Sequence, residues 1–336
     1  MKKLVTLLVV VLLLPSAVTA GPITSIFVFG DSFSDGGNAA VISGNIVPPS
    51  PPYAQRFSNG PVAVEYLASQ LGISLTASLG PSGGTNYAVG GAATTQVAIP
   101  GGGGATTNNF ETINPAVPDS VKPLFAGRGI DAQVGAFVAA PPVFDPASAL
   151  FVVWGGMNDL FISADAVTAA NAVNALAAHI QMLYGVGAQN FLVPNMVDLS
   201  LAPFALARPP AEQADLLALS VGFNSGLAIA LNSLGVLPGI NITPFDTFAF
   251  NRAAVANPAA FGFTNVTGSC LDAVVGPCAS PDEYLYWDGV HLTTRAHELL
   301  ANDLRQAIAE PAVPEPAILI LVAAGLAGAV WRRALR

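Results

Sequence analysis

Residues 23–38 read ITSIFVFGDSFSDGGN, and this stretch decides which fold the rest of the chain is expected to adopt. Its first part, residues 23–29, is short, largely apolar and rich in β-branched side chains. The run ends at Gly30 and leads directly into a polar, glycine-rich turn. Apolar runs of this length are typical of strands buried on both faces, which belong to parallel sheets. We therefore expect a buried strand with a turn at its carboxyl end.

Similar runs recur along the chain, separated by segments with helical periodicity. Strands that alternate with helices indicate an α/β fold around a mostly parallel sheet. Residues 100–123 are rich in Gly, Asn, Thr and Pro and are expected to form a long surface loop. The further expected strands are 148–156, 188–196 and 239–248, and the expected helices are 60–72, 131–140, 164–184, 209–234 and 293–310.

Two of these strands run directly into polar turns, GDSFSDGGN (residues 30–38) and GGMND (residues 155–159). In open parallel sheets, ligands bind in the crevice beyond the carboxyl ends of the strands. The two turns should therefore face the same crevice.

Ser32 lies in the first turn, which has little bulk to bury it. A serine in this place can act as a nucleophile only when a base lies within hydrogen-bond reach, because a free hydroxyl barely ionises at neutral pH. The alternative role is a helix N-cap, which serine often occupies. The turn by itself leaves both roles open.

Of the three histidines in the chain, only His291 has a carboxylate at a useful spacing, in YLYWDGVHLT, residues 284–293. Asp288 precedes it by three residues and can accept from one ring nitrogen while the other nitrogen faces a hydroxyl. A metal site formed by this pair would need further ligands, and the sequence offers none nearby. The third alternative is that both are simply polar residues at the start of a helix. His179 and His297 lie within expected helices, and His179 is expected to be packed or on the surface.

Acyl transfer also needs hydrogen-bond donors for the negative charge that develops on the carbonyl oxygen. The Ser32 N–H, the side-chain amide of Asn158 and a glycine N–H in NYAVGGA, residues 86–92, are the candidates. Asn and Gly also favour turns for purely structural reasons, and this is the alternative explanation for Asn158 and for the glycine.

The two ends of the chain predict export. Residues 1–20 combine two lysines, a short apolar run and small residues before Gly21, as a signal peptide does.

The body between the two ends is acidic. The ends carry five of the 12 basic residues and one of the 21 acidic residues of the chain, so the body has 7 basic and 20 acidic residues. A body this acidic argues against a nucleic-acid partner. In an exported protein, Cys270 and Cys278 are expected to form a disulfide rather than a metal site.

Residues 313–336 read VPEPAILILVAAGLAGAVWRRALR, a Pro-rich break followed by an apolar run and three arginines. This tail resembles the PEP-CTERM sorting signal of Gram-negative bacteria. The resemblance implies transient membrane anchoring, cleavage by an exosortase-type enzyme, and release of the body, residues 21–312, at the cell surface, in the outer envelope or outside the cell. A permanent C-terminal anchor is the alternative.

Four stretches, FVFGDSFSDGGN, NYAVGGA, GGMND and YWDGVHLT, occur here in the order typical of the GDSL esterase/lipase family, also called the SGNH hydrolases. The resemblance implies a three-layer α/β/α, flavodoxin-like sandwich. It assigns Ser32 as nucleophile, His291 as base and Asp288 as its orienting acid. The oxyanion donors it implies are Ser32, Asn158 and, of two neighbouring glycines, Gly91 rather than Gly90. Asp35, Asn38 and Asp159 are expected to support the loops.

The sequence therefore predicts an exported serine esterase or lipase that hydrolyses a small-molecule or lipid ester through an acyl-enzyme, without a cofactor or metal. An acyltransferase or carbohydrate deacetylase on the same triad is the first alternative. A non-enzymatic cell-surface or matrix protein is the second, and such a protein has no reason to retain the whole set of polar groups.

Overall fold

Four parallel strands form the central sheet of the computed structural model. Their order is β1 (Ser25–Gly30), β4 (Ala149–Trp154), β5 (Asn190–Pro194) and β6 (Asn241–Phe245). The structure describes residues 22–309 except 113, 273 and 274, so the predicted signal peptide and sorting tail lie outside the described residues. All four strands fall within the ranges expected from their apolar runs, apart from one residue at the end of β1.

The segment 85–89 runs beside β1 as an irregular fifth strand. Val28 N–H donates to Thr85 O over 2.9 Å, and Val89 N–H donates to Gly30 O over 3.1 Å. With this segment included, the strands follow the flavodoxin-like order 2-1-3-4-5, whose ligand crevice opens where the order reverses, between β1 and β4. The NYAVGGA stretch is thereby brought next to the turn that carries Ser32.

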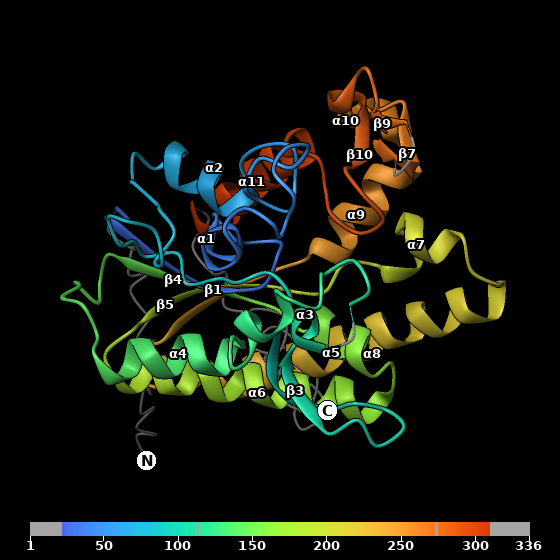
Figure 1. Cartoon of the computed structure of the whole chain (residues 1–336). Helices are drawn as coiled ribbons and strands as arrows, with labels where there is room; N and C mark the ends of the chain where they lie inside the picture. The colour runs from blue at the N-terminus through green and yellow to red at the C-terminus, as the bar shows by residue number, and fades with distance from the viewer. Residues whose placement is uncertain (1–21, 113, 273–274, 310–336) are drawn as a thin grey trace, which may run out of the picture. The chain divides into compact units, whose positions relative to one another are not determined.

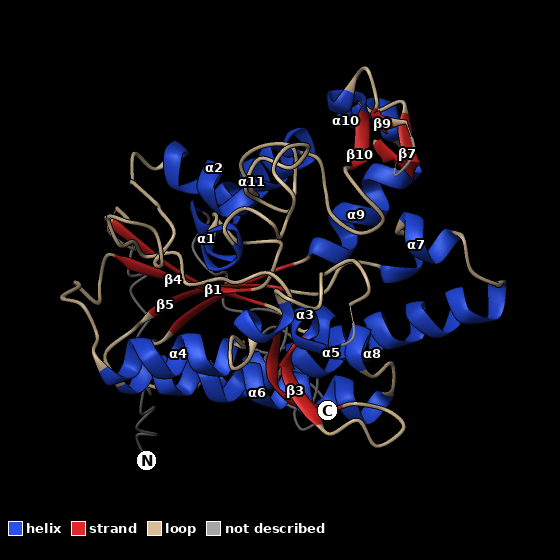
Figure 2. Ribbon diagram, viewed as in Figure 1, coloured by secondary structure: helices blue, strands red, loops and turns tan. Residues whose placement is uncertain are grey.

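Helices cover both faces of the sheet (Figures 1 and 2), so the domain Pro22–Ala309 has the three layers expected from the family resemblance. On one face lie α1 (Asn38–Ser43), α2 (Ala63–Gln70) and α11 (Thr294–Ala309), and on the other lie α4 (Ile130–Ala139), α6 (Ala166–Gly185) and α8 (Pro210–Leu234).

Among the described residues, α8 is the one helix long and apolar enough to cross a membrane by length and composition. It contacts α6 and β6, and its Phe223, Leu227 and Leu231 are buried. Packing against α6 and β6 accounts for these buried side chains, whereas Val221 and Ile229 of the same helix are 47% and 69% exposed.

The core is built mainly by β1 and β4, in which every residue except Ser25 is buried. Phe27 of β1 stacks on Phe151 of β4 with ring centroids 5.0 Å apart, and Phe137 of α4 meets both rings edge-on. Burying a phenylalanine side chain contributes about 1.5–3 kcal/mol. These contacts fix the two strands whose carboxyl ends carry Ser32 and Asn158.

The prediction of a long surface loop over residues 100–123 was wrong from Ala105 onward, where a strand, a short helix and buried side chains follow. β2 (Ala92–Ala98) and β3 (Ala105–Asn108) form a hairpin, which α3 (Asn109–Thr112) and the 3₁₀ turn η1 (Lys122–Phe125) follow. Phe110, Val117 and Val121 are buried in a small cluster with Phe57. These apolar residues are spaced irregularly in a polar stretch, which hides them from periodicity analysis.

A small subdomain precedes the last helix. It contains η2 (Leu199–Leu201), α7 (Pro203–Leu206), α9 (Thr247–Ala256), α10 (Pro258–Phe261), β7 (Asn265–Ser269), β8 (Leu271–Asp272), β9 (Gly276–Pro277), η3 (Pro281–Glu283) and β10 (Tyr284–Tyr286).

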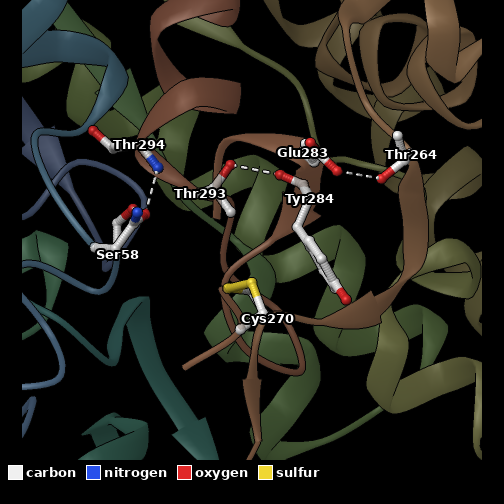
Figure 3. Close-up of a disulfide and its surroundings, with 9 residues drawn as sticks. Ser58, Thr264, Cys270, Glu283, Tyr284, Thr293 and Thr294 are labelled. Carbon is white, nitrogen blue, oxygen red and sulfur yellow. Dashed lines mark hydrogen bonds between the residues drawn. A yellow bond between two sulfur atoms is a disulfide. The ribbon is translucent and has the colours of Figure 1, made fainter. Parts of the chain in front are cut away.

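The expected disulfide joins Cys270 to Cys278 in this subdomain (Figure 3). Cys270 N–H donates to Tyr286 O over 3.0 Å, and Thr293 Oγ1 donates to Tyr284 O over 2.7 Å. β10 is thus held on both sides just before the chain enters the loop 287–293.

Candidate active site

A continuous hydrogen-bonded chain joins the turn after β1 to the loop after β10. His291 Nε2 lies 2.8 Å from Ser32 Oγ, and His291 Nδ1 lies 2.8 Å from Asp288 Oδ2. Because a carboxylate only accepts, Nδ1 carries the proton and Nε2 is left to accept from the serine hydroxyl. The structure therefore brings together the three residues that the sequence analysis selected, in the arrangement of a catalytic triad.

Asp288 shapes the loop as well as orienting the ring. Its Oδ1 accepts the backbone N–H of Val290 over 2.8 Å and of His291 over 2.7 Å, as aspartate does in local turns. Trp287 N–H donates to His291 O over 2.7 Å and closes the loop. One carboxylate thus uses one oxygen to hold the backbone and the other to hold the imidazole.

Burial alone would raise the pKa of Asp288, but the charge of His291 and the hydrogen bonds from His291 and Tyr53 together hold the pKa of this carboxyl below its usual range. The side chain of Asp288 is 18% exposed and that of His291 is 15% exposed. The carboxylate therefore stays ionised beside the ring, as an orienting acid must.

Ser32 is 6% exposed and does not cap a helix, because α1 begins at Asn38 with Gly37 at its N-cap. The turn around Ser32 is held by its neighbours. Asp31 Oδ1 accepts Phe33 N–H over 3.0 Å, and Asp35 accepts the N–H groups of the residues that open α1. The N-cap alternative for Ser32 is thereby excluded.

The two candidate oxyanion glycines differ in what their N–H groups already do. Gly90 N–H donates to Asp35 Oδ2 over 2.8 Å. Within the described part of the chain, no acceptor is assigned to the N–H of Gly91 or of Ser32. Gly91 has φ +76°, and a Cβ there would lie 2.5 Å from Asn108 Oδ1 and 2.6 Å from Phe110. Gly91 is therefore the glycine whose donor remains available, and no larger residue fits in its place.

Asn158 lies at the start of α5 (Met157–Ile162), directly beyond β4, and is 4% exposed. Its Oδ1 accepts from Asn109 Nδ2 over 3.3 Å. In this arrangement Asn158 Nδ2 is the donor end of the amide, and a hydrogen bond from this side chain also lowers the pKa of Asp31.

Asn109 was missed by the sequence analysis, and so was its neighbour Asn108. Asn108 Nδ2 donates to Gly90 O over 3.1 Å, and Asn109 N–H donates to Gly91 O over 2.7 Å. Both residues thus hold the Gly90–Gly91 turn. Two adjacent asparagines in a polar stretch are the only signal in the sequence, and by themselves they indicate a turn.

Three buried carboxyls surround this part of the site. Burial raises the pKa of Asp31 to about 6, of Asp35 to about 6 and of Asp159 to about 7. As expected, Asp35 and Asp159 support loops, since Asp159 accepts from the N–H and hydroxyl of Thr94 over 2.9 and 2.6 Å. Asn38 does likewise, donating to Asn86 O and Ala88 O over 2.8 Å each.

The other two histidines are buried away from Ser32 Oγ. His179 Nε2 donates to Thr94 O over 2.7 Å, and burial lowers the pKa of this ring. His297 Nδ1 accepts Ala63 N–H over 3.2 Å, and burial lowers its pKa to about 3. Within residues 22–309, leaving aside 113, 273 and 274, no three His, Cys, Asp or Glu side chains are grouped to hold a metal ion.

A family model described as GDSL-like Lipase/Acylhydrolase matches residues 26–304, and a PEP-CTERM protein-sorting motif matches residues 312–334. The chain is 26% identical over 308 residues to a thermolabile hemolysin of Vibrio parahaemolyticus, covering 86% of this chain and 65% of the hemolysin. It is 25% identical over 311 residues to a GDSL esterase/lipase of Arabidopsis thaliana, covering 84% of this chain and 88% of that protein. The hemolysin is thus about half as long again as the part that this chain matches.

Among solved structures, the chain resembles a member of the lipolytic protein G-D-S-L family from Veillonella parvula. The TM-score is 0.43 and the sequence identity 14%, over 84% of this chain and 97% of that one.

Proposed function

The chain belongs to the GDSL-like lipase/acylhydrolase family, and on that basis we propose that it is an exported serine hydrolase that cleaves carboxylic esters through an acyl-enzyme on Ser32. The observation that carries the proposal is the continuous hydrogen-bonded chain Ser32–His291–Asp288, with both contacts to the imidazole at 2.8 Å. The sorting motif at residues 312–334 indicates export to the cell envelope of a Gram-negative bacterium.

In the first half-reaction, Ser32 Oγ attacks the ester carbonyl while His291 Nε2 takes its proton. Asp288 holds Nδ1–H and stabilises the imidazolium that forms. Since Oγ and Nε2 are already 2.8 Å apart, the base needs no rearrangement to accept the proton. The imidazolium then gives its proton to the departing alkoxide, and the alcohol leaves.

The tetrahedral intermediate carries its negative charge on the former carbonyl oxygen. The N–H groups of Ser32 and Gly91 and the amide of Asn158 donate to that oxygen, which costs no reorganisation because all three are fixed by the fold. Water then attacks the acyl-enzyme with His291 as base, and collapse of the second intermediate releases the carboxylic acid and restores Ser32.

Hydrolysis of a series of p-nitrophenyl esters by the purified protein tests this function. Ser32→Ala should reduce kcat by about 10⁶-fold, as removal of the nucleophile does in other serine hydrolases. Ser34→Ala is the matched control, because its hydroxyl is buried two residues away and has no hydrogen-bond partner among the described residues. Full activity of Ser32→Ala, or no hydrolysis of any ester by the unmodified protein, would exclude the proposal.

Acyl transfer on the same three residues is the second candidate function, because the same acyl-enzyme can react with an alcohol in place of water. Product analysis with an added alcohol acceptor separates the two. If acylated alcohol exceeds free acid at moderate acceptor concentration, transfer replaces hydrolysis as the assignment.

A further inference from the structure

We propose that Tyr53 is a positioning residue of the catalytic chain and acts through Asp288. This inference rests on the proposed function, since it concerns the acid of the same triad. Tyr53 Oη donates to Asp288 Oδ2 over 2.7 Å, the same oxygen that receives His291 Nδ1–H. The chain of hydrogen bonds therefore has a fourth member, Tyr53–Asp288–His291–Ser32.

The tyrosine completes the coordination of the carboxylate. Asp288 Oδ1 receives two backbone N–H groups, from Val290 and His291, and Oδ2 receives the imidazole and the phenol. Four donors fill the approximate acceptor capacity of an ionised carboxylate. Without the phenol, Oδ2 has a site for water or for rotation away from the ring.

Tyr53 is held in place because its segment, residues 53–60, is attached to the end of the loop 287–293 and to the chain directly beyond it. Ser58 Oγ donates to Leu292 O over 2.9 Å, and Thr294 N–H donates to Asn59 Oδ1 over 2.8 Å. The Tyr53 ring also meets Trp287 edge-on, with centroids 6.0 Å apart. The phenol is therefore presented to Asp288 from a fixed direction.

A second ring of this segment covers the histidine. Phe57 is 5% exposed, and its ring centroid lies 5.2 Å from that of His291. Residues 53–57 thus close over the Asp288–His291 pair, one by a hydrogen bond and one by packing. Removal of water from such a pair strengthens the electrostatic interactions within it.

The hydrogen bond from Tyr53 is also one of the interactions that hold the pKa of Asp288 below its usual range. Loss of the phenol therefore removes a donor that favours the ionised carboxylate. It should weaken the stabilisation of the imidazolium that forms during the reaction. The expected effect is a lower kcat with KM unchanged.

Other charged or titratable groups also face the Asp288–His291 pair, and the test must leave these groups unchanged. The charges of Asp31 and of the buried His297 interact with His291, and the Asp35 carboxylate interacts with that of Asp31. None of the three receives a hydrogen bond from Tyr53. A change that follows removal of the Tyr53 hydroxyl alone is therefore attributable to Asp288.

The test compares Tyr53→Phe with Tyr66→Phe in p-nitrophenyl ester hydrolysis. Tyr66 is a matched control, because its hydroxyl makes a 2.9 Å hydrogen bond to Thr294 Oγ1, near the same loop, but touches no triad residue. Tyr53→Phe should lower kcat roughly tenfold, as loss of one hydrogen bond to a charged group does, with KM unchanged. In an Asp288→Asn background the same substitution should have no further effect on kcat.

Tyr66→Phe should lower the melting temperature and leave kcat unchanged. The positioning role would be overturned by a Tyr53→Phe variant that melts earlier but retains normal kcat, or by one whose loss of kcat is equally large in the Asp288→Asn background. The activity of Ser32→Ala is measured alongside. If it stays high, the proposed function fails, whereas an inactive Ser32→Ala together with a normal kcat of Tyr53→Phe refutes the role of Tyr53 alone.

Discussion

The two sides of Ser32 are built differently. On the proton-transfer side, His291 and Asp288 come from one short loop, are titratable, and are joined by hydrogen bonds of 2.8 Å. On the oxyanion side, the donors that we propose come from three separate places in the chain: the turn after β1, the segment beside it and the start of α5. They are backbone N–H groups and an amide.

This difference has a consequence for how each side responds to substitution. The proton-transfer side works through charge, so changes there alter both the rate and its dependence on pH. In the proposed mechanism the oxyanion side works through neutral dipoles held by the sheet, so changes there should lower kcat at every pH. The following substitutions test that separation, from the largest expected effect to the smallest.

Asp288→Asn should have the largest effect of the three, about a 10⁴-fold loss of kcat, because an amide can donate to Nδ1 and so favours the wrong tautomer of His291. The loop can keep its shape, since the amide oxygen can still accept the N–H groups of Val290 and His291. Asp282→Asn, an exposed acid in η3, is the control and should be fully active.

Steady-state kinetics of the two variants, with circular dichroism to verify folding, measures the effect. A well-folded Asp288→Asn variant with more than a tenth of the normal kcat would mean that the charge of Asp288 matters little. The two sides of Ser32 would then not differ in the way described.

Asn158→Ala should lower kcat by about 10²–10³-fold, the usual result of removing one oxyanion donor. KM should change little, because the donor acts on charge that develops in the transition state. Because the Asn158 amide also lowers the pKa of Asp31, which is about 6, kcat is compared near that pH and well above it. A loss of kcat that appears only near pH 6 would show that Asn158 acts through Asp31, and the two sides would then not be separable.

How much of this the sequence could predict also differs between the two sides. The proton-transfer pair is local, so the spacing of Asp288 and His291 indicated it, but the spacing by itself left metal ligation and a helix start open. The apolar runs were enough to locate the four strands, and with them Asn158 as a candidate at a strand end. The choice of Gly91 over Gly90 needed the resemblance to a family, because its place depends on the pairing of segment 85–89 with β1.

Asn109 and Tyr53 could not be selected from the sequence. Asn109 lies in a polar stretch that was expected to be a surface loop, and it becomes buried only because Phe110 and its neighbours pack in a cluster with Phe57. Tyr53 lies 235 residues before its partner, Asp288. A contact of that separation has no periodicity or spacing that a single sequence reveals.

Asn109→Ala should have the smallest effect of the three and is the most discriminating for the oxyanion side. Its hydrogen bond to Asn158 Oδ1 is long, 3.3 Å, and a neutral hydrogen bond contributes about 1 kcal/mol, so kcat should fall roughly fivefold. If Asn109 acts only by orienting Asn158, its removal should have no further effect in an Asn158→Ala background. A double-mutant cycle on kcat measures this coupling. Additive losses would mean that the Asn109 side chain acts by a route other than Asn158. The hydrogen bond from Asn109 N–H to Gly91 O is retained in the alanine variant, so it takes no part in the measured coupling.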